Sequence, residues 1–514
     1  NGGINMISNV INQIDAIAEN TGDLIAYDEL GRKHTYAQLK SCSDSLAAHI
    51  DSLNLPAEAP IMVYGGQQFE MITSFLGSVK SGHAYIPVDK SSADERLTDI
   101  LEIGKPALVI AVDELPIKIA SVPVIDPKAL TDIFDNETPY QITHPVEGDD
   151  NFYIIFTSGT TGKPKGVQIS HRNLISFADW MLSDDFNWPE KSQVLSQPPY
   201  SFDLSVMDWA PALLSSSTLK ALPKETADDF KTLFATLPKL DLNIWVSTPS
   251  FADVALLDPN FTQENLPRLT HFLFCGEVLT STTAQKLLAR FPKATVYNTY
   301  GPTEATVAVS GLPITKAVIA ANDKMPIGYV KSDTTIKIQD PDGQDVPAGE
   351  TGEIVICGPS VSKGYLNNPE KTAQAFKQID GHQAYKTGDL ATMDSSGLLH
   401  YRGRSDFQIK LHGFRIELEE VAQQLQQSHY VAQAAAVPRY DDEGKVKQLL
   451  AVIVASDNSF EKPMQLTNAI KDELKDIMMP YMVPGRFIYR EAMPLTPNGK
   501  IDLKGLIAEV NGDA

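Results

Sequence analysis

Cysteine is scarce in this sequence, which contains three cysteines among 514 residues. Cys42, Cys275 and Cys357 lie far apart, and their spacing matches no usual pattern of metal ligands. These features exclude a disulfide framework or a zinc site as the organising element of the fold. The cysteine content is typical of a protein from a reducing compartment.

Positive charge is also in deficit, because 43 lysines and arginines stand against 65 aspartates and glutamates, a net charge of −22. This balance argues against nucleic acid or an anionic membrane as the main partner. The first basic residue is Arg32, and no apolar run approaches the roughly 20 residues of a membrane-spanning helix. We therefore expect a cytoplasmic protein without membrane insertion, in which any anionic ligand needs a local cluster of cations.

The hydrophobic pattern predicts the fold class α/β. Helical periodicity over residues 36–50 and 69–79 alternates with short apolar runs at residues 61–64 and 107–112. Such alternation is typical of layered structure with largely parallel strands. We expect a large N-terminal domain of layered α/β subdomains over residues 6–404.

Two changes of pattern divide the rest of the chain. From about residue 325 to 404, short strands broken by Gly- and Asp-rich turns predict a small β subdomain. Residues 407–514 contain amphipathic helices near 418–425 and 466–477 and a buried strand near 449–455. They predict a smaller α+β C-terminal domain.

A loop rich in phosphate-binding groups lies between two apolar runs at residues 151–156 and 167–170. Its glycines allow backbone N–H groups to approach an anion closely, and its hydroxyls and lysines add donors and charge. It is no Walker A loop, because Pro164 follows Lys163 and a strand follows the loop. A flexible turn is the alternative interpretation. The candidate nucleotide-binding residues are Thr157, Ser158, Gly159, Thr160, Thr161, Gly162 and Lys163.

This loop resembles the signature of the adenylate-forming enzymes, which include acyl-CoA synthetases, luciferases and the adenylation domains of peptide synthetases. Further matches narrow the resemblance to the D-alanine:D-alanyl carrier protein ligases, over about Met6 to Leu506. The resemblance implies binding of ATP and Mg²⁺. It also implies a mobile C-terminal domain that rotates about a hinge at Asp406.

Three further segments match the family's nucleotide site. In these enzymes the Asn and Tyr of the first segment hold adenine, its Glu serves Mg²⁺, and the Asp and Arg of the other two contact ribose and phosphate. Taken singly, each residue is also explained as a turn residue or a surface charge. The matching nucleotide-binding residues are Asn298, Thr299, Tyr300, Gly301, Pro302, Thr303, Asp389, Tyr401, Arg402, Gly403 and Arg404, and the metal ligand is Glu304.

Three residues match the amino-acid pocket. Asp203 stands in a mostly apolar stretch, where it either caps the following helix or, as in amino-acid-activating relatives, holds the substrate ammonium. Cys275 ends an apolar strand and is by itself an ordinary core residue. In the D-alanine ligases a Cys at this position lines a cramped side-chain pocket, and we expect Cys275 and Val307 to read chirality by exclusion.

Lys500 lies in a Pro- and Gly-containing turn at residues 494–502, where a solvated lysine is the plain interpretation. By resemblance it is the catalytic lysine, which contacts nucleotide and substrate by bridging the α-phosphate and the substrate carboxylate. Preorganised charge of this kind commonly contributes about 10² to 10³ in rate.

The resemblance implies a monomeric ligase that activates D-alanine as D-alanyl-AMP and transfers it to a phosphopantetheine thiol. No Leu-Gly-Gly-x-Ser segment follows Lys500, so we expect a separate D-alanyl carrier protein. The downstream role would be D-alanylation of lipoteichoic and teichoic acids in the cell wall. The alternatives are an enzyme for another small amino acid, an acyl-CoA synthetase, which Asp203 disfavours, and a non-catalytic nucleotide-binding module.

Overall fold

The computed structural model describes residues 6–159, 162–496 and 500–512. By its internal contacts the chain forms two compact units. The first unit consists of Asn1–Lys90, Gly104–Ile155 and Gly166–Ser405, and the second of Ser91–Ile103, Phe156–Lys165 and Asp406–Ala514. The second unit thus contains the predicted phosphate loop as well as the predicted C-terminal domain.

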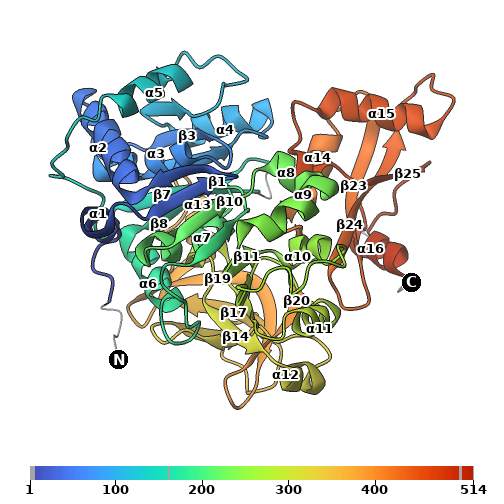
Figure 1. The fold of residues 1–514 in the computed structure, drawn as a ribbon. Coiled ribbons are helices and arrows are strands. Elements are labelled where there is room, and N and C mark those ends of the chain that lie inside the picture. Colours follow the sequence, from blue (N-terminus) through green and yellow to red (C-terminus); the bar gives the residue numbers. More distant parts are fainter. Residues whose placement is uncertain (1–5, 160–161, 497–499, 513–514) are drawn as a thin grey trace. The chain divides into compact units, whose positions relative to one another are not determined.

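Two largely parallel sheets form most of the first unit. The six-stranded sheet has the order β6-β5-β3-β4-β7-β8, with β3 Ile61–Gly65, β4 Tyr85–Asp89, β5 Leu108–Ala111, β6 Val124–Ile125, β7 Asn151–Thr157 and β8 Lys165–Ser170. All five residues of β3 are buried, as expected for a parallel strand covered on both faces. Helices α3 and α5 pack against β3 and β5 (Figure 1).

The second sheet of this unit has nine strands in the order β15-β14-β13-β12-β11-β9-β10-β1-β2. Its strands are β1 Ile25–Glu29, β2 Arg32–Thr35, β9 Gln193–Ser196, β10 Thr218–Ala221, β11 Ile244–Ser247, β12 His271–Phe274, β13 Thr295–Tyr300, β14 Ser310–Ile314 and β15 Tyr329–Val330. The central strands β9 to β13 are parallel, and antiparallel strands form the edges.

A five-stranded antiparallel sheet forms the rest of the first unit. It consists of β16 Thr335–Gln339, β17 Gly352–Cys357, β18 Phe376–Ile379, β19 His382–Met393 and β20 Leu399–Arg404. With the two parallel sheets, it confirms the predicted fold class, including the small β subdomain.

Helices cover the sheets of the first unit. They are α1 Val10–Thr21, α2 Tyr36–Ser52, α3 Phe69–Lys80, α5 Pro127–Asp135, α6 His171–Met181, α7 Leu204–Leu214, α8 Lys224–Asp228, α9 Phe230–Thr236, α10 Pro249–Ala255, α11 Ser281–Arg290, α12 Lys316–Ala321 and α13 Pro369–Ala375, with the 3₁₀ turns η1 Leu237–Leu240 and η2 Thr303–Ala305. Capping side chains set where several of these helices begin. At α6, the Ser170 side chain accepts the Asn173 N–H, and the Asn173 side-chain oxygen accepts the Ser170 N–H.

The second unit is an α+β structure with its own core. Its strands are β21 Gln408–Leu411, β22 Phe414–Glu417, β23 Val431–Tyr440, β24 Val446–Ala455 and β25 Arg486–Arg490, and its helices are α4 Asp94–Gly104, α14 Leu418–Leu425, α15 Pro463–Leu474 and α16 Leu503–Asn511, with η3 Pro480–Met482. Ala93 belongs to this core, and its N–H donates to Met479 Sδ at 3.5 Å. The role of Asp406 as a hinge between domains stays a prediction.

Among the helices of the described residues, none is both long and apolar enough to cross a membrane.

A buried histidine ties α6 to the start of α1. His171 is 1% exposed, and its Nε2 accepts the Val10 N–H at 3.0 Å, so this nitrogen carries no proton. Burial lowers the pKa of His171 from 6.5 to about 4. The folded state therefore keeps the imidazole neutral at a pH where the unfolded chain protonates it.

We expect this histidine to make the first unit less stable in acid. Because the folded pKa lies below the unfolded one, stability is fully present above pH 6.5 and declines as the pH falls toward about 4. The slope for one proton is about 1.4 kcal/mol per pH unit. Thermal unfolding midpoints should fall less steeply with acidification in His171→Gln than in wild type. The exposed His144, changed to Gln, is the control; equal slopes in wild type and His171→Gln would contradict the prediction.

Candidate active site

Three of the predicted side chains are joined by hydrogen bonds at the carboxylate of Asp389. The Tyr300 hydroxyl donates to Oδ2 at 2.5 Å, and Arg404 Nη1 donates to Oδ1 at 2.8 Å. Asp389 is 4% exposed, so these two donors replace the water that the charge would otherwise need. The structure therefore brings together residues from three distant segments of the chain.

Strand register explains this arrangement. Asp389 on β19 lies directly opposite Arg404 on β20, and cross-strand neighbours of opposite charge are a favourable pair. The Arg404 guanidinium also donates to the carbonyl of Thr387 at 3.1 Å, and the Asp389 N–H donates to Thr387 Oγ1 at 3.0 Å. Tyr300 is the last residue of β13, so it reaches the carboxylate from the nine-stranded sheet.

The other residues of the 401–404 segment differ in whether they lie near the Asp389 cluster. Arg402 is exposed, and its Nε donates to Thr392 Oγ1 at 3.3 Å, so this predicted residue contacts Thr392 of β19 and not the Asp389 carboxylate. Gly403 has φ of +104°, a conformation that favours glycine. The pKa of Tyr300 is raised well above its usual value, first by burial, then by Asp389, with a smaller effect of Tyr401. Tyr401 therefore lies near the cluster.

The turn after β13 requires its glycine. A Cβ on Gly301 would lie 2.4 Å from the Cα of Ala308 and 2.7 Å from the carbonyl oxygen of Val307. Before the turn, the Asn298 side-chain amide donates to the Pro326 carbonyl at 2.8 Å, and Thr299 Oγ1 donates to the Phe274 carbonyl at 2.7 Å. Pro302 is buried and Thr303 half-buried as the turn enters η2. The backbone thus folds back tightly beside Tyr300.

Glu304 lies in η2 and is fully buried. Its Oε1 accepts the Tyr365 hydroxyl at 2.8 Å. Within the described ranges, no group of three or more His, Cys, Asp or Glu side chains is arranged to hold a metal ion. Mg²⁺ commonly takes one or two carboxylates and completes its shell with phosphate and water, so a single buried carboxylate fits such an ion.

Cys275 and Val307 are in contact, as their predicted roles in one pocket require. The Cys275 thiol lies 3.7 Å from the Val307 carbonyl oxygen, and both residues are buried. Thr306 and Val307 have φ of +61° and +68°, which is rare for β-branched residues. Thr306 Oγ1 holds the strained segment by donating to the Ser360 carbonyl at 2.7 Å. Strain of this kind concentrates at functional sites.

Asp203 occupies the N-cap position of α7, but its side chain makes no capping hydrogen bond in the described structure. The capping interpretation of this acid is therefore wrong. Asp203 is 6% exposed, and after burial its charge is the next largest cause that raises the pKa of Tyr153, on β7. A buried carboxylate at this point is suited to a cationic ligand.

The predicted phosphate loop is part of the second unit, where its polar groups contact residues of that unit. Ser158 Oγ donates to the Arg415 carbonyl at 2.8 Å, and the Gly159 N–H donates to Glu420 Oε2 at 3.2 Å. Lys163 forms an ion pair with Asp99. Gly162 has φ of +77°. Thr160 and Thr161 lie outside the described residues.

Within the described residues, Thr157 carries an unsatisfied polar atom in this loop. Its Oγ1 is buried, and in the part of the chain that the structure describes it has no hydrogen-bond partner. A buried hydroxyl without a partner is costly, and a phosphate oxygen would satisfy it. The sequence did not signal Asp99 or Glu420, because both stand at ordinary polar positions of amphipathic helices.

Lys500 belongs to the second unit and is exposed, and its backbone is hydrogen-bonded to Thr496. Its N–H donates to Thr496 Oγ1 at 3.2 Å, and its carbonyl accepts the Thr496 N–H at 2.7 Å. Residues 497–499 of the predicted catalytic turn lie outside the described residues. Asp406 begins the C-terminal segment of this unit, and its Oδ1 accepts the Gln408 N–H at 3.1 Å.

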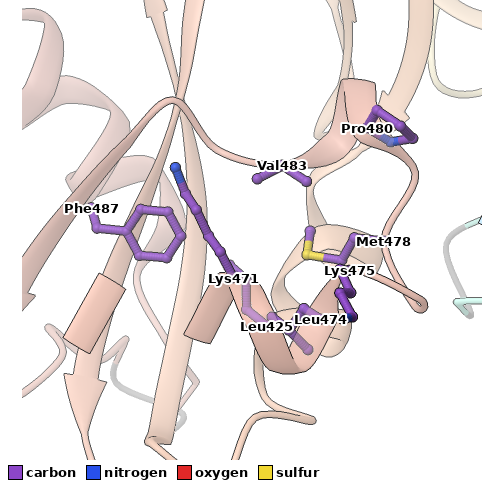
Figure 2. Close-up of a pocket in the computed structure, with 8 residues that line it drawn as sticks. All are labelled: Leu425, Lys471, Leu474, Lys475, Met478, Pro480, Val483 and Phe487. Atoms are coloured by element: carbon purple, nitrogen blue, oxygen red, sulfur yellow. The ribbon is translucent and has the colours of Figure 1, made fainter. Parts of the chain in front are cut away.

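A separate cavity of about 240 Å³ lies between α14, α15 and β25 of the second unit. Figure 2 shows its apolar residues, with Lys471 beside Phe487. The ammonium of Lys471 lies 5.4 Å from the centre of the Phe487 ring, a favourable cation–π distance. The lining residues are Leu425, Lys471, Leu474, Lys475, Met478, Pro480, Val483 and Phe487, which include none of the predicted site residues.

Known proteins resemble the chain over nearly its whole length. Profiles of the AMP-binding enzyme and of the AMP-binding enzyme C-terminal domain match residues 14–366 and 420–500. The D-alanine–D-alanyl carrier protein ligases of Lactiplantibacillus plantarum and Streptococcus agalactiae serotype V are 60% and 57% identical, each over 98% of this chain and 100% of its own length.

Among solved structures, the fold is similar to an NRPS protein that contains adenylation and PCP domains and is bound to a vinylsulfonamide inhibitor. The TM-score is 0.81 at 25% identity, over 97% of this chain and 84% of that chain.

The importance of the negative charge at Asp389 can be tested by substitution. Asp389→Asn keeps the shape of the side chain but removes the negative charge beside Arg404, whose side chain is 10% exposed. Breaking a buried ion pair costs about 3–5 kcal/mol, so we expect a lower thermal midpoint of the first unit. Because the sequence predicts Asp389 as a nucleotide-binding residue, we also expect ATP binding to weaken about tenfold or more in calorimetry, through loss of a charged hydrogen bond.

Asp241→Asn is the matched control. Asp241 accepts from Arg268 at 2.5 Å, but both side chains are about half exposed, and the φ of +51° at Asp241 suits asparagine. An exposed pair contributes little, so this variant should resemble wild type. Equal losses in the two variants would show that the Asp389 cluster has no special role.

Proposed function

We infer the function of this chain from its family, since it belongs to the AMP-binding enzymes and, within them, to the D-alanine–D-alanyl carrier protein ligases. We propose that it activates D-alanine with ATP to D-alanyl-AMP and transfers the D-alanyl group to the phosphopantetheine thiol of a separate carrier protein. The observation that carries the proposal is the 60% identity to a ligase of that name over 98% of this chain.

The nucleotide would bind at the Asp389 cluster. Each Asp389 oxygen accepts one hydrogen bond from the protein, and a carboxylate oxygen has room for a second, so the ribose hydroxyls can donate to it. Tyr300 and Asn298 would hold adenine, while Arg404 would contact ribose and phosphate. Thr157, Ser158, Gly159 and Lys163 would bind the phosphates, and Glu304 would be the protein ligand of Mg²⁺, which neutralises phosphate charge when bound.

The amino acid would be recognised by charge at one end and by shape at the other. Asp203 would pair with the ammonium, an interaction that simple carboxylic acids cannot make. Cys275 and Val307 would line a pocket that accepts the methyl group in only one orientation. Since D- and L-alanine carry the same groups, exclusion by these side chains is the physical basis available for selectivity.

The first step needs positioning and charge stabilisation more than an activated nucleophile. An oxygen of the D-alanine carboxylate forms a bond to the α-phosphorus, the bond to the bridging oxygen breaks, and pyrophosphate leaves with the electron pair. Lys500 would stabilise the charge that shifts between carboxylate and phosphate. In the second step the thiol sulfur bonds to the D-alanyl carbonyl carbon, AMP leaves, and the thiol proton passes to solvent.

The carrier-bound D-alanine would serve D-alanylation of lipoteichoic and teichoic acids in cell wall biogenesis. Esterification leaves the ammonium of D-alanine free, so each transferred group adds a positive charge to a polyanion. The enzyme would act in the cytoplasm as a monomer, with the carrier protein as its macromolecular partner. Its net charge of −22 supports the absence of nucleic acid from its partners.

Exchange of pyrophosphate into ATP across a small amino-acid panel tests this function. We expect D-alanine to support exchange far better than L-alanine, glycine or D-serine. Asp203→Asn should abolish it, because an amide cannot neutralise the ammonium. Asp208→Asn is the matched control, since this acid of α7 is fully buried and accepts the Ser196 hydroxyl at 3.1 Å. A different preferred amino acid, or equal loss in both variants, would contradict the proposal.

Lys500→Ala separates the two steps. We expect this variant to lose ATP–pyrophosphate exchange by about 10² or more, because a preorganised charge is removed from the first transition state. Thioester formation from preformed D-alanyl-AMP should be retained, since rotation of the C-terminal domain would withdraw Lys500 before that step. The exposed Lys504, changed to Ala, is the control. Equal loss of both steps in Lys500→Ala would contradict domain rotation.

A further inference from the structure

Glu420 makes an unusual contact for a buried acid. It stands in the first turn of α14, is 2% exposed, and accepts the Gly159 N–H through Oε2 at 3.2 Å. Gly159 presents this amide because the loop folds back on itself: a Cβ there would lie 2.1 Å from the Lys163 carbonyl oxygen. A carboxylate thus occupies a backbone donor that the sequence assigns to a phosphate.

The neighbouring donors of the loop are occupied in the same way. Ser158 Oγ donates to the Arg415 carbonyl at 2.8 Å, and Lys163 pairs with Asp99. An amide, a hydroxyl and an ammonium of the loop therefore each bind an oxygen of the second unit. Three groups that the sequence predicts as phosphate ligands are thus occupied by oxygens of the protein itself.

The environment of Glu420 makes its contact exchangeable. Burial raises its pKa to about 7, against the opposing effects of Arg96 and the Gly159 amide, while Glu417 and Asp99 raise it further. Gln424 Nε2 lies 3.4 Å from its other oxygen, and Tyr481 lies within electrostatic reach. Few donors and cations offset the cost of burying this carboxylate, so an anion with more charge can readily displace it from the Gly159 amide.

We propose that Glu420 is an internal competitor of pyrophosphate, which takes the Gly159 amide when pyrophosphate leaves and thereby opposes its return. The proposal rests on the function proposed above. The Glu420 carboxylate and a phosphate cannot both accept the Gly159 N–H, and two negative charges so close together repel each other. The Glu420–Gly159 contact and a phosphate bound at this amide therefore exclude each other. Adenylation would become less reversible. Glu420 is thus a positioning residue that acts through the loop.

Binding of pyrophosphate to the full chain, measured by calorimetry, tests the proposal directly. Glu420→Gln keeps an oxygen that can accept the amide but removes the charge. We expect it to bind pyrophosphate about fivefold to tenfold more tightly than wild type above pH 7, and to be more strongly inhibited by pyrophosphate in D-alanyl-AMP formation. The ratio between variant and wild type should shrink toward one as the pH falls to about 6, because wild-type Glu420 then takes up a proton.

Glu419→Gln is the matched control, because this exposed acid stands in the same turn and changes the net charge equally. Unchanged pyrophosphate affinity in Glu420→Gln, or an equal gain in Glu419→Gln, would overturn the proposal. Glu420→Asp provides a second variant for the case of poor folding: it keeps the buried charge but withdraws it from the amide, and should also tighten binding. Exchange that fails for D-alanine in wild type would reject the proposed function, whereas the calorimetric comparison of Glu420 would stand.

Discussion

A buried carboxylate needs donors or a cation, and this requirement shapes the candidate site. Tyr300 and Arg404 donate hydrogen bonds to Asp389. Tyr365 donates one to Glu304, and the Gly159 amide donates one to Glu420. Asp208, by contrast, accepts a hydrogen bond from Ser196, and burial raises its pKa well above its usual value. The donors and charges around each buried acid thus decide how easily it carries a negative charge.

This requirement also explains how an acidic chain can bind a polyanion. The proposed donors are backbone amides, hydroxyls and a few cations held in place by strand register and tight turns, so local geometry would outweigh the net charge of −22. Register places Arg404 opposite Asp389, and the turn at Gly301 brings the end of β13 beside Val307. Both are properties of the first unit alone, whereas the phosphate loop belongs to the second.

Periodicity and turn chemistry predicted most of the fold. The apolar positions near residues 418–425 became α14, the run near 449–455 lies inside β24, and the alternation before residue 150 became the six-stranded sheet. Family motifs predicted the members of the Asp389 cluster. Contacts between polar residues far apart in the sequence could not be predicted from any local pattern. Lys163 and Asp99 are separated by 64 positions, and Gly159 and Glu420 by 261. Nor did the sequence decide whether Asp203 caps α7.

The left-handed backbone at Val307 bears on how easily amino-acid specificity can evolve. Valine is strained at φ of +68°, whereas glycine adopts this conformation without penalty. Replacing Val307 with glycine would enlarge the proposed amino-acid pocket and relieve strain in a single substitution. Cys275 follows β12 and is as buried as Val307, so a smaller side chain would leave a void at either position, but of the two only Val307 has backbone strain to relieve. In the proposed pocket, a change of substrate range should therefore arise more readily by substitution at position 307 than at position 275.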